Sequence, residues 1–190
     1  MNLPNKLTLL RIILIPAFML FAAEPPGWLY APAAGFIMEY GLATAGAIFV
    51  VAFATDLLDG HIARKYNLVT DFGIFLDPIA DKLLVTAALV ALTARGALGA
   101  WIPVVIVSRE LIVTGMRLLG ANKGVVLAAG RLGKIKTFVQ WAALTLMLFG
   151  NFGAAFLINI NAGLALLYIA AVLTIISGAD YIIKNRSLFG

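Results

Sequence analysis

The sequence contains no cysteine, a single histidine and few charged residues, which make up 12% of its 190 positions. Without cysteine, the chain has no disulfides and no thiol chemistry. Zinc centres usually take cysteine or histidine ligands, so this composition disfavours them. The scarcity of charge, with 63% hydrophobic residues and a mean hydropathy of +1.03, excludes an ordinary soluble domain. The sequence also lacks internal repeats, low-complexity tracts and long linkers, so we expect one domain over residues 1–190.

Long apolar runs are abundant instead. The hydrocarbon core of a bilayer is about 30 Å thick, and a helix needs about 20 apolar residues to cross it. The runs that approach or exceed this length lie at about 7–23, 34–58, 73–94, 101–119, 131–150 and 154–180. We therefore predict an all-α integral membrane fold with six transmembrane helices.

The basic residues are distributed unevenly between the two sides of this predicted bundle. With six spans, both termini share one side with the predicted loops 59–72 and 120–130. That side and its helix ends hold thirteen of the fourteen lysines and arginines, whereas the other side holds Arg95 alone. The positive-inside rule then predicts an inner (plasma) membrane protein with both termini in the cytoplasm. A basic cytoplasmic face suits anionic lipid headgroups or phosphorylated substrates better than nucleic acid.

Four aspartates lie at the cytoplasmic edges of the second and third predicted spans: Asp56, Asp59, Asp77 and Asp81. The second helix is expected to end near Asp56 and Asp59, and the third helix is expected to carry Asp77 and Asp81. Spacings of three and four place each pair on one helical face, and the short loop makes the two helices antiparallel neighbours. A charge in lipid costs about 2.5–3.5 kcal/mol, so the four carboxylates require a polar cavity that also holds cations. Oxygen ligands favour Mg²⁺, Mn²⁺ or Ca²⁺, and two such ions suit displacement at phosphorus. Helix caps, interfacial ion pairs and proton-relay groups are the alternatives for either pair alone.

The same segment carries a longer pattern, D-x2-D-G-x2-A-R-x8-G-x3-D-x3-D, over residues 56–81. Its fixed positions are Asp56, Asp59, Gly60, Ala63, Arg64, Gly73, Asp77 and Asp81. At each of these positions the chain resembles the CDP-alcohol phosphotransferase family. The resemblance implies transfer of a phosphatidyl or substituted phosphoryl group from a CDP-linked donor to an alcohol, with release of CMP. It also implies six membrane helices, two divalent cations (Mg²⁺ or Mn²⁺) and a homodimer.

The resemblance further implies roles for individual residues. It assigns metal binding to Asp56, Asp59 and Asp77, while Asp81 matches both a metal ligand and the base that deprotonates the acceptor hydroxyl. The contacts that it implies for the CDP donor are Asp56, Gly60, Ala63, Arg64 and Gly73.

Near the N-terminus, the resemblance includes Asn5, Thr8 and Arg11, which it places at the cytidine or phosphates of the donor. A helix cap plus a snorkelling arginine is the structural alternative for these three residues.

A second group of basic residues, Arg109, Arg117, Lys134 and Lys136, lies outside the motif. Arg109 and Arg117 are eight residues apart, about 80° around a helix, so both can face one cavity. The two lysines start the next helix. Together these residues suit a small phosphate monoester, because arginine gives bidentate contacts and lysine a point charge. Ordinary positive-inside anchoring of the helices is the alternative.

Similarity outside the motif narrows the expected substrates. Resemblance to family members that use CDP-diacylglycerol and sn-glycerol 3-phosphate runs almost end to end, through NLPNKLTLLRIILIP, LVTDFGIFLDPIADKLLV, SRELIVTGMRLL and GRLGKIKT. It implies these two substrates among membrane lipids. Serine, inositol phosphate and a second phospholipid remain alternative acceptors. An ion-coupled transporter with cation-binding aspartates is a further alternative, although the sequence shows no inverted repeat.

Overall fold

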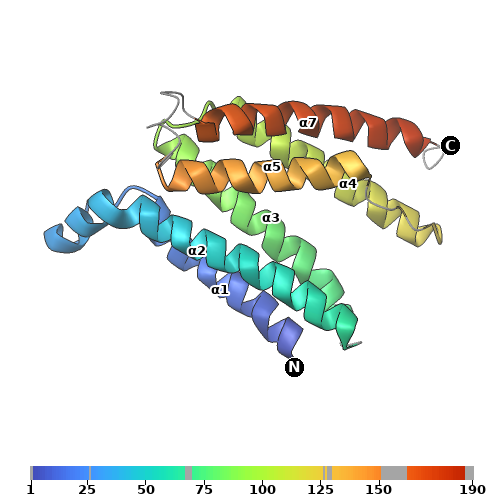
Figure 1. Ribbon diagram of the computed structural model, residues 1–190, viewed down its shortest axis with the longest axis horizontal. Coiled ribbons are helices and arrows are strands. Elements are labelled where there is room, and N and C mark those ends of the chain that lie inside the picture. The colour runs from blue at the N-terminus through green and yellow to red at the C-terminus, as the bar shows by residue number, and fades with distance from the viewer. Residues whose placement is uncertain are drawn as a thin grey trace. The chain divides into compact units, whose positions relative to one another are not determined.

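The computed structural model describes residues 2–25, 27–66, 70–125, 127, 130–150 and 162–186, and the regular structure in these ranges is helical. The helices are α1 (Leu3–Ala22), α2 (Ala31–Lys65), α3 (Asp71–Ala94), α4 (Trp101–Asn122), α5 (Arg131–Leu148) and α7 (Ala162–Lys184). Figure 1 shows their course along the chain. The predicted all-α fold is therefore confirmed for the part of the chain that the structure describes.

Three of the described helices are long and apolar enough to cross a membrane: Asn5–Ala22, Ala31–Asp56 and Ala162–Lys184. Each of α3, α4 and α5 carries at least three charged residues, which lower its hydropathy. Most of those charges are the candidate site residues of these helices. The apolar helices thus support a membrane protein, while six spans stay a prediction.

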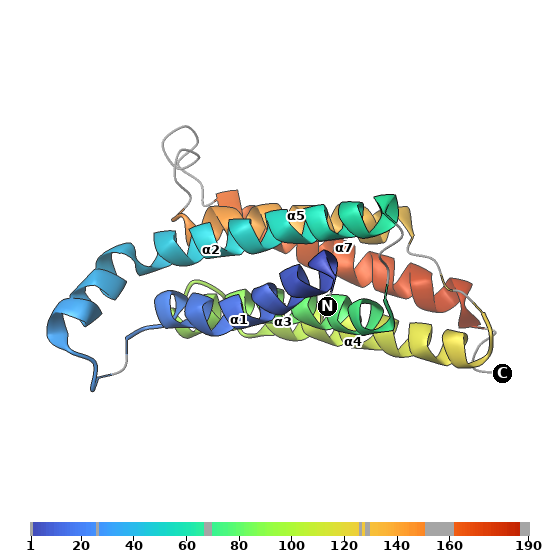
Figure 2. The same cartoon turned by 90° about the horizontal axis from the view of Figure 1, so that it is seen from below.

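Several helix boundaries differ from the sequence prediction by a few residues, and two of them bear on the site or on the predicted spans. The expected end of the second helix near Asp56 and Asp59 is wrong, because α2 continues to Lys65 and part of the motif is helical rather than a loop. Most residues of this stretch are good helix formers, and Gly60 alone opposes the helix by about 1 kcal/mol relative to alanine. Figure 2 follows α2 as one ribbon to this end. The last helix ends at Lys184 rather than near 180, and residues 154–161 of its predicted range lie outside the described residues.

Side-chain caps set the starts of α1 and α3. The side chain of Asn2 accepts a hydrogen bond from the backbone N–H of Asn5 at 3.2 Å. The hydroxyl of Thr70 accepts one from the N–H of Gly73 at 3.1 Å. Each cap satisfies a backbone donor that the first turn of a helix leaves unpaired.

The described chain divides into two compact units, and the first unit (Met1–Leu98 with Leu148–Gly150) contains α1, α2 and α3. In this unit, α1 packs against both other helices. Early in α1, Arg11 pairs with Asp56 late in α2, whereas the rings of Phe18 and Phe49 meet further along, 6.1 Å apart. The two helices are therefore antiparallel. They approach closely at Gly41, where a Cβ atom would lie 2.5 Å from a backbone oxygen of α1.

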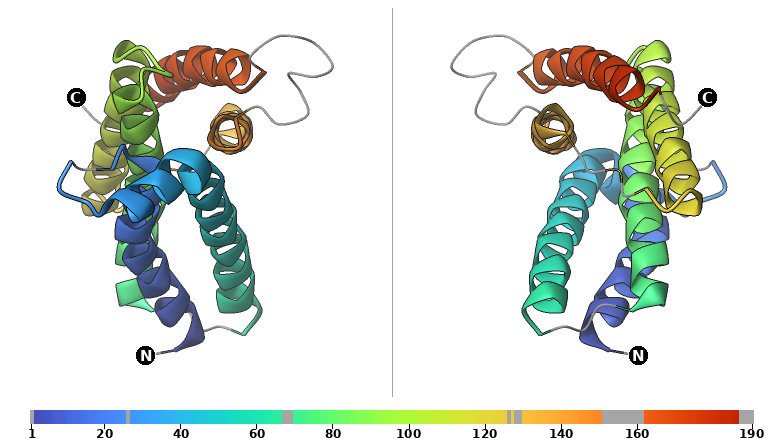
Figure 3. Two further views of the ribbon diagram at one scale, coloured as in Figure 1. Left: turned by 90° about the vertical axis from the view of Figure 1, so that its left-hand side faces the viewer. Right: turned by 90° about the vertical axis from the view of Figure 1, so that its right-hand side faces the viewer.

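Helices α1 and α3 of the first unit run in the same direction. Thr8 contacts Asp77 near their starts, and Arg95 contacts the backbone of Ala22 near their ends. The start of α1, the end of α2 and the start of α3 consequently lie at one end of the unit, as Figure 3 shows. The candidate aspartates belong to this end.

The second unit (Gly99–Met147 with Asn151–Gly190) contains α4, α5 and α7, and in it α4 packs against α7. The rings of Trp101 and Tyr168 lie 5.6 Å apart near the starts of these two helices, and Arg117 contacts Tyr181 near their ends. Helices α4 and α7 are therefore parallel. In a chain of six spans that alternate in direction, the first and third spans are parallel, and so are the fourth and sixth. The directions of α1 and α3, and of α4 and α7, agree with this pattern.

Candidate functional site

A buried polar row on α1 organises the site in the first unit. Asn5, Thr8 and Arg11 follow one another at intervals of three residues, so they lie on one face of the helix. Their exposed fractions are 7%, 1% and 0%. Buried polar groups are unfavourable unless they are paired, so this face must meet polar partners on the neighbouring helices.

Two of these partners are motif aspartates. The Nη1 atom of Arg11 lies 2.8 Å from a carboxylate oxygen of Asp56 on α2. The hydroxyl of Thr8 donates a hydrogen bond to Asp77 on α3 at 2.5 Å. Helix α1 thus connects one carboxylate from each motif helix through residues a single turn apart.

Asn5, the remaining residue of the row, contacts the start of α3. The Thr70 hydroxyl donates to the side-chain oxygen of Asn5 at 2.9 Å, and a Cβ atom on Gly73 would lie 3.0 Å from that oxygen. Gly73 therefore allows a close approach between the start of α3 and the side chain of Asn5. The alternative of a helix cap with a snorkelling arginine is wrong, because Asn2 caps the helix and Arg11 is fully buried.

The carboxylates of this unit have the chemistry that a divalent cation requires. The side chain of Asp56 is 35% exposed, and Asp77 lies near enough to repel it electrostatically. Arg11 offsets the charge of Asp56, whereas the hydroxyl of Thr8 brings no charge to Asp77. Asp81 is half-buried one turn further along α3. Oxygen donors with surplus negative charge fit Mg²⁺ or Mn²⁺.

The complete ligand set extends beyond the described side chains. Among the side chains that the structure describes, no group of three or more His, Cys, Asp or Glu residues comes together around a possible metal position. Four motif residues, Asp59, Gly60, Ala63 and Arg64, lie in the last turns of α2 with side chains outside the description. Their roles in metal and donor binding stay predictions.

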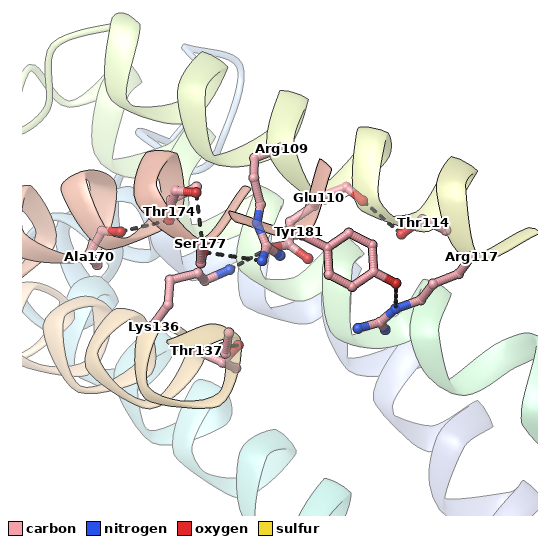
Figure 4. Close-up of polar contacts among 11 residues, drawn as sticks. Arg109, Glu110, Thr114, Arg117, Lys136, Thr137, Ala170, Thr174, Ser177 and Tyr181 are labelled. Carbon is pink, nitrogen blue, oxygen red and sulfur yellow. Dashed lines mark hydrogen bonds and ion pairs between the residues drawn. The ribbon is translucent and has the colours of Figure 1, made fainter. Parts of the chain in front are cut away.

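In the second unit, Arg109 and Lys136 meet at one carboxylate. Arg109 Nη1 donates to Glu110 Oε1 at 3.2 Å, and the ammonium group of Lys136 donates to the same oxygen. Lys136 is only 3% exposed, so it is part of the interior and not a surface anchor. Arg109 Nη2 also donates to the hydroxyl of Ser177 on α7 at 3.2 Å, as Figure 4 shows.

The other two predicted acceptor residues lie differently. Arg117 Nε donates to the hydroxyl of Tyr181 at 3.4 Å, and its guanidinium carbon lies 5.8 Å from the centre of that ring. Lys134 is exposed to solvent. The structure therefore brings together Arg109 and Lys136, and it describes no contact that joins Arg117 or Lys134 to them.

Sequence reasoning missed the residues that support this cluster: Glu110, Ser177, Gly178 and Tyr181. Glu110 directly follows Arg109 in an apolar run, and such an adjacent charge pair is a usable signal. The α7 residues form a short polar and small-residue patch near the end of an apolar helix. That patch resembles ordinary helix packing in the sequence, so their pairing with the arginines emerges only in three dimensions.

Comparison with known proteins agrees with the motif. Residues 1–176 match the model of the CDP-alcohol phosphatidyltransferase family. The CDP-diacylglycerol–glycerol-3-phosphate 3-phosphatidyltransferase of Bacillus subtilis (strain 168) is 45% identical over 184 residues, which are 97% of this chain and 95% of the relative. The enzyme with the same name from Rickettsia felis is 39% identical, over 99% of this chain and 97% of the relative.

A third relative carries a different form of the name. The probable phosphatidylglycerophosphate synthase of Mycobacterium tuberculosis (strain H37Rv) is 40% identical over 96% of this chain and 81% of its own length. The matches thus cover the buried row on α1, the motif, and the predicted acceptor residues Arg109, Arg117, Lys134 and Lys136. The chain belongs to the CDP-alcohol phosphatidyltransferase family.

Proposed function

We propose that this chain transfers the phosphatidyl group of CDP-diacylglycerol to sn-glycerol 3-phosphate, giving phosphatidylglycerophosphate and CMP. Similarity over nearly the whole chain to relatives named for this reaction supports the proposal. The observation that carries it is the buried row on α1, which holds the motif carboxylates Asp56 and Asp77 at one end of their helices.

The reaction exchanges one bond to phosphorus for another. The 1-hydroxyl oxygen of the acceptor bonds to the phosphorus of the phosphatidyl group, and the bond from that phosphorus to the oxygen retained by CMP breaks. CMP leaves with the bonding electron pair, and Asp81 accepts the proton of the hydroxyl. A general base contributes about 10²–10⁴ to such a rate, and positioning and electrostatic stabilisation contribute most of the remainder.

Two divalent cations belong to this proposal, since a metal requirement is general in the family. Asp56, Asp59, Asp77 and Asp81 would hold them. Bound Mg²⁺ or Mn²⁺ offsets negative charge on the diphosphate and on the leaving group. Gly60, Ala63, Arg64 and Gly73 are proposed to accommodate the CDP part of the donor, together with the α1 row.

Arg109 and Lys136, which form the basic cluster of the second unit, are proposed to bind the phosphate of the acceptor. Arg109 offers a planar fork of donors, and the Nε–H of this arginine is buried without a hydrogen-bond partner among the described residues. Lys136 adds a buried positive charge beside it. We assign peripheral roles in the same function to Arg117 and Lys134.

The chain is a membrane protein by its apolar helices and its family. We place it in the inner (plasma) membrane as a homodimer with six spans and both termini in the cytoplasm. The excess of basic residues on one predicted side and the helix directions within each unit support this topology.

The test is CMP release from CDP-diacylglycerol by the purified protein in detergent, with and without sn-glycerol 3-phosphate. We expect release to depend on glycerol 3-phosphate, with serine and inositol phosphate inactive. Release that requires a different acceptor would keep the family chemistry and overturn the acceptor. No release with any of these acceptors would overturn the transferase itself.

A further inference from the structure

Three residues of the second unit contact the cations of the basic cluster without belonging to the predicted acceptor site. We infer that Glu110, Ser177 and Gly178 are positioning residues that hold Arg109 and Lys136 for the phosphate of the acceptor. The inference rests on the proposed function, because it explains how the acceptor site of that function keeps its shape.

Glu110 determines where Lys136 lies. Its Oε1 atom accepts hydrogen bonds from both Arg109 on its own helix and Lys136 on α5. A buried ammonium group that loses its carboxylate is strongly unfavourable, and a long lysine side chain then extends toward water. Glu110 therefore keeps Lys136 inside the unit and next to Arg109.

Gly178 determines the path of Arg109. A Cβ atom at Gly178 would lie 2.9 Å from Cγ of Arg109 and 3.7 Å from its Nε. Carbon atoms in favourable contact are about 3.5–4.0 Å apart, so a methyl group at this position would displace the arginine. The missing side chain on α7 thus provides the space through which the alkyl part of Arg109 passes.

Ser177 fixes the far end of the same side chain. Its hydroxyl accepts from Arg109 Nη2 at 3.2 Å and donates to the backbone oxygen of Thr174 at 3.2 Å. Because the serine is only 4% exposed, water competes little for this contact. Figure 4 shows the guanidinium group between Ser177 on α7 and Glu110 on α4.

This arrangement favours a phosphate over an uncharged acceptor. Two cations, Arg109 and Lys136, share a single carboxylate, so one positive charge remains within the cluster. A phosphate monoester can neutralise that charge, whereas an acceptor with hydroxyl groups alone cannot. The positioning residues therefore contribute to specificity through the two cations.

The test compares Gly178→Ala with Gly115→Ala in the full-length protein in detergent. A Cβ atom at Gly115 on α4 meets no atom within 4 Å, so this variant is a matched control. We expect Gly178→Ala to raise the KM for glycerol 3-phosphate about tenfold with kcat within about twofold. The KM for CDP-diacylglycerol should stay unchanged, and Gly115→Ala should resemble the wild type in every parameter.

Two further substitutions separate positioning from general damage. Ser177→Ala should raise the KM for glycerol 3-phosphate about three- to tenfold. Ser177→Thr, which keeps the hydroxyl, should have a KM close to that of the wild type. Glu110→Gln should also raise this KM. Stabilisation against heat by added glycerol 3-phosphate should weaken in the Gly178, Ser177 and Glu110 variants, which gives a binding readout without catalysis.

The outcomes distinguish the inference from the function on which it rests. Unchanged KM values in Gly178→Ala and Ser177→Ala would overturn the inference while leaving the transferase intact. A lower KM in Glu110→Gln would also overturn it, since Glu110 would then compete with the phosphate. Equal increases for both substrates would indicate general damage and count against positioning. A wild-type protein that ignores glycerol 3-phosphate would instead overturn the proposed function.

Discussion

The hydroxyl of Thr8 lies 2.5 Å from a carboxylate oxygen of Asp77, a residue 69 positions further along the chain. One turn along α1, Arg11 makes the corresponding contact with Asp56. The first helix is therefore part of the candidate site, in addition to being one of the apolar helices. Substitutions of Thr8 and Arg11 should therefore affect catalysis as well as the packing of α1.

Thr8→Val should lower kcat/KM for CDP-diacylglycerol about tenfold to a hundredfold. The change keeps the shape of the side chain but removes a hydrogen bond to a charged group, which contributes about 1.5–3 kcal/mol. Thr8→Ser should retain most of the activity. Thr93→Val is the control, because among the described residues the Thr93 hydroxyl bonds only to the backbone of its own helix, at 2.8 Å from the oxygen of Leu89. Similar losses in both valine variants would contradict a specific role for Thr8.

Chelation of divalent cations should abolish turnover. Asp56 on α2 and Asp77 on α3 offer oxygen ligands, which suit Mg²⁺ or Mn²⁺. EDTA should therefore stop CMP release, and added Mg²⁺ or Mn²⁺ should restore it. Asp56→Asn, Asp59→Asn and Asp77→Asn should each reduce turnover by orders of magnitude. Asp180→Asn is the control, since Asp180 pairs with the exposed Lys184 outside the motif. Full activity of a metal-stripped enzyme would be incompatible with the proposed cation site.

Asp81→Asn should separate donor binding from turnover. The amide cannot accept the proton of the acceptor hydroxyl, so kcat should fall by about 10²–10⁴. Binding of CDP-diacylglycerol should persist, because the other three motif aspartates are unchanged. The measurement is titration of the variant with the donor alongside a CMP-release assay. If the variant no longer binds the donor, Asp81 is chiefly a metal ligand and the base is another residue.

Arg109→Ala should raise the KM for glycerol 3-phosphate and leave that for the donor nearly unchanged. Loss of a charge-assisted hydrogen bond of about 1.5–3 kcal/mol corresponds to a decrease in kcat/KM of about tenfold to a little over a hundredfold. Lys123→Ala, at the exposed C-terminal end of α4, should have little effect and serves as the control. Equally small effects at both positions would mean that these basic residues only anchor the helices.

Arg95→Ala should lower stability without changing the KM of either substrate. Arg95 Nε donates to the backbone oxygen of Ala22 at 2.7 Å, and Nη2 donates to that of Ala23 at 3.2 Å. These carbonyls lie at the end of α1, where a helix leaves acceptors unpaired. Loss of both contacts should cost about 1–3 kcal/mol and lower the Tm in detergent by several degrees. Lys184→Ala, which removes an exposed ion pair, should leave the Tm nearly unchanged.

The sequence was sufficient for the features that depend on local pattern. Apolar runs predicted the positions of the helices to within a few residues at most of the described ends. The spacing of the four aspartates predicted a shared site, and their role as metal ligands stays a prediction. The end of α2 was misplaced because charged residues after Asp56 were read as a loop, although their helix propensity is adequate.

Contacts between residues that are far apart in the chain could not be predicted from the sequence. From the sequence alone, a helix cap with a snorkelling arginine was an open alternative for the α1 row, because its partners on α2 and α3 are visible only in the structure. Gly178 acts through the side chain that it lacks, and such a role becomes visible only when Arg109 is placed beside it. Glu110 appeared as a neighbour of Arg109, but its bond to Lys136 joins separate helices.

The burial of Arg11 also constrains how the protein is made. During synthesis, α1 reaches the bilayer before Asp56, which follows Arg11 by 45 positions in the sequence. At about 5–20 residues per second, translation takes a few seconds to cover this distance. An arginine alone in lipid costs about 2.5–3.5 kcal/mol on insertion scales. We therefore expect α1 to wait at the translocon or near the interface until α2 arrives, so that the two helices enter the bilayer together as a hairpin.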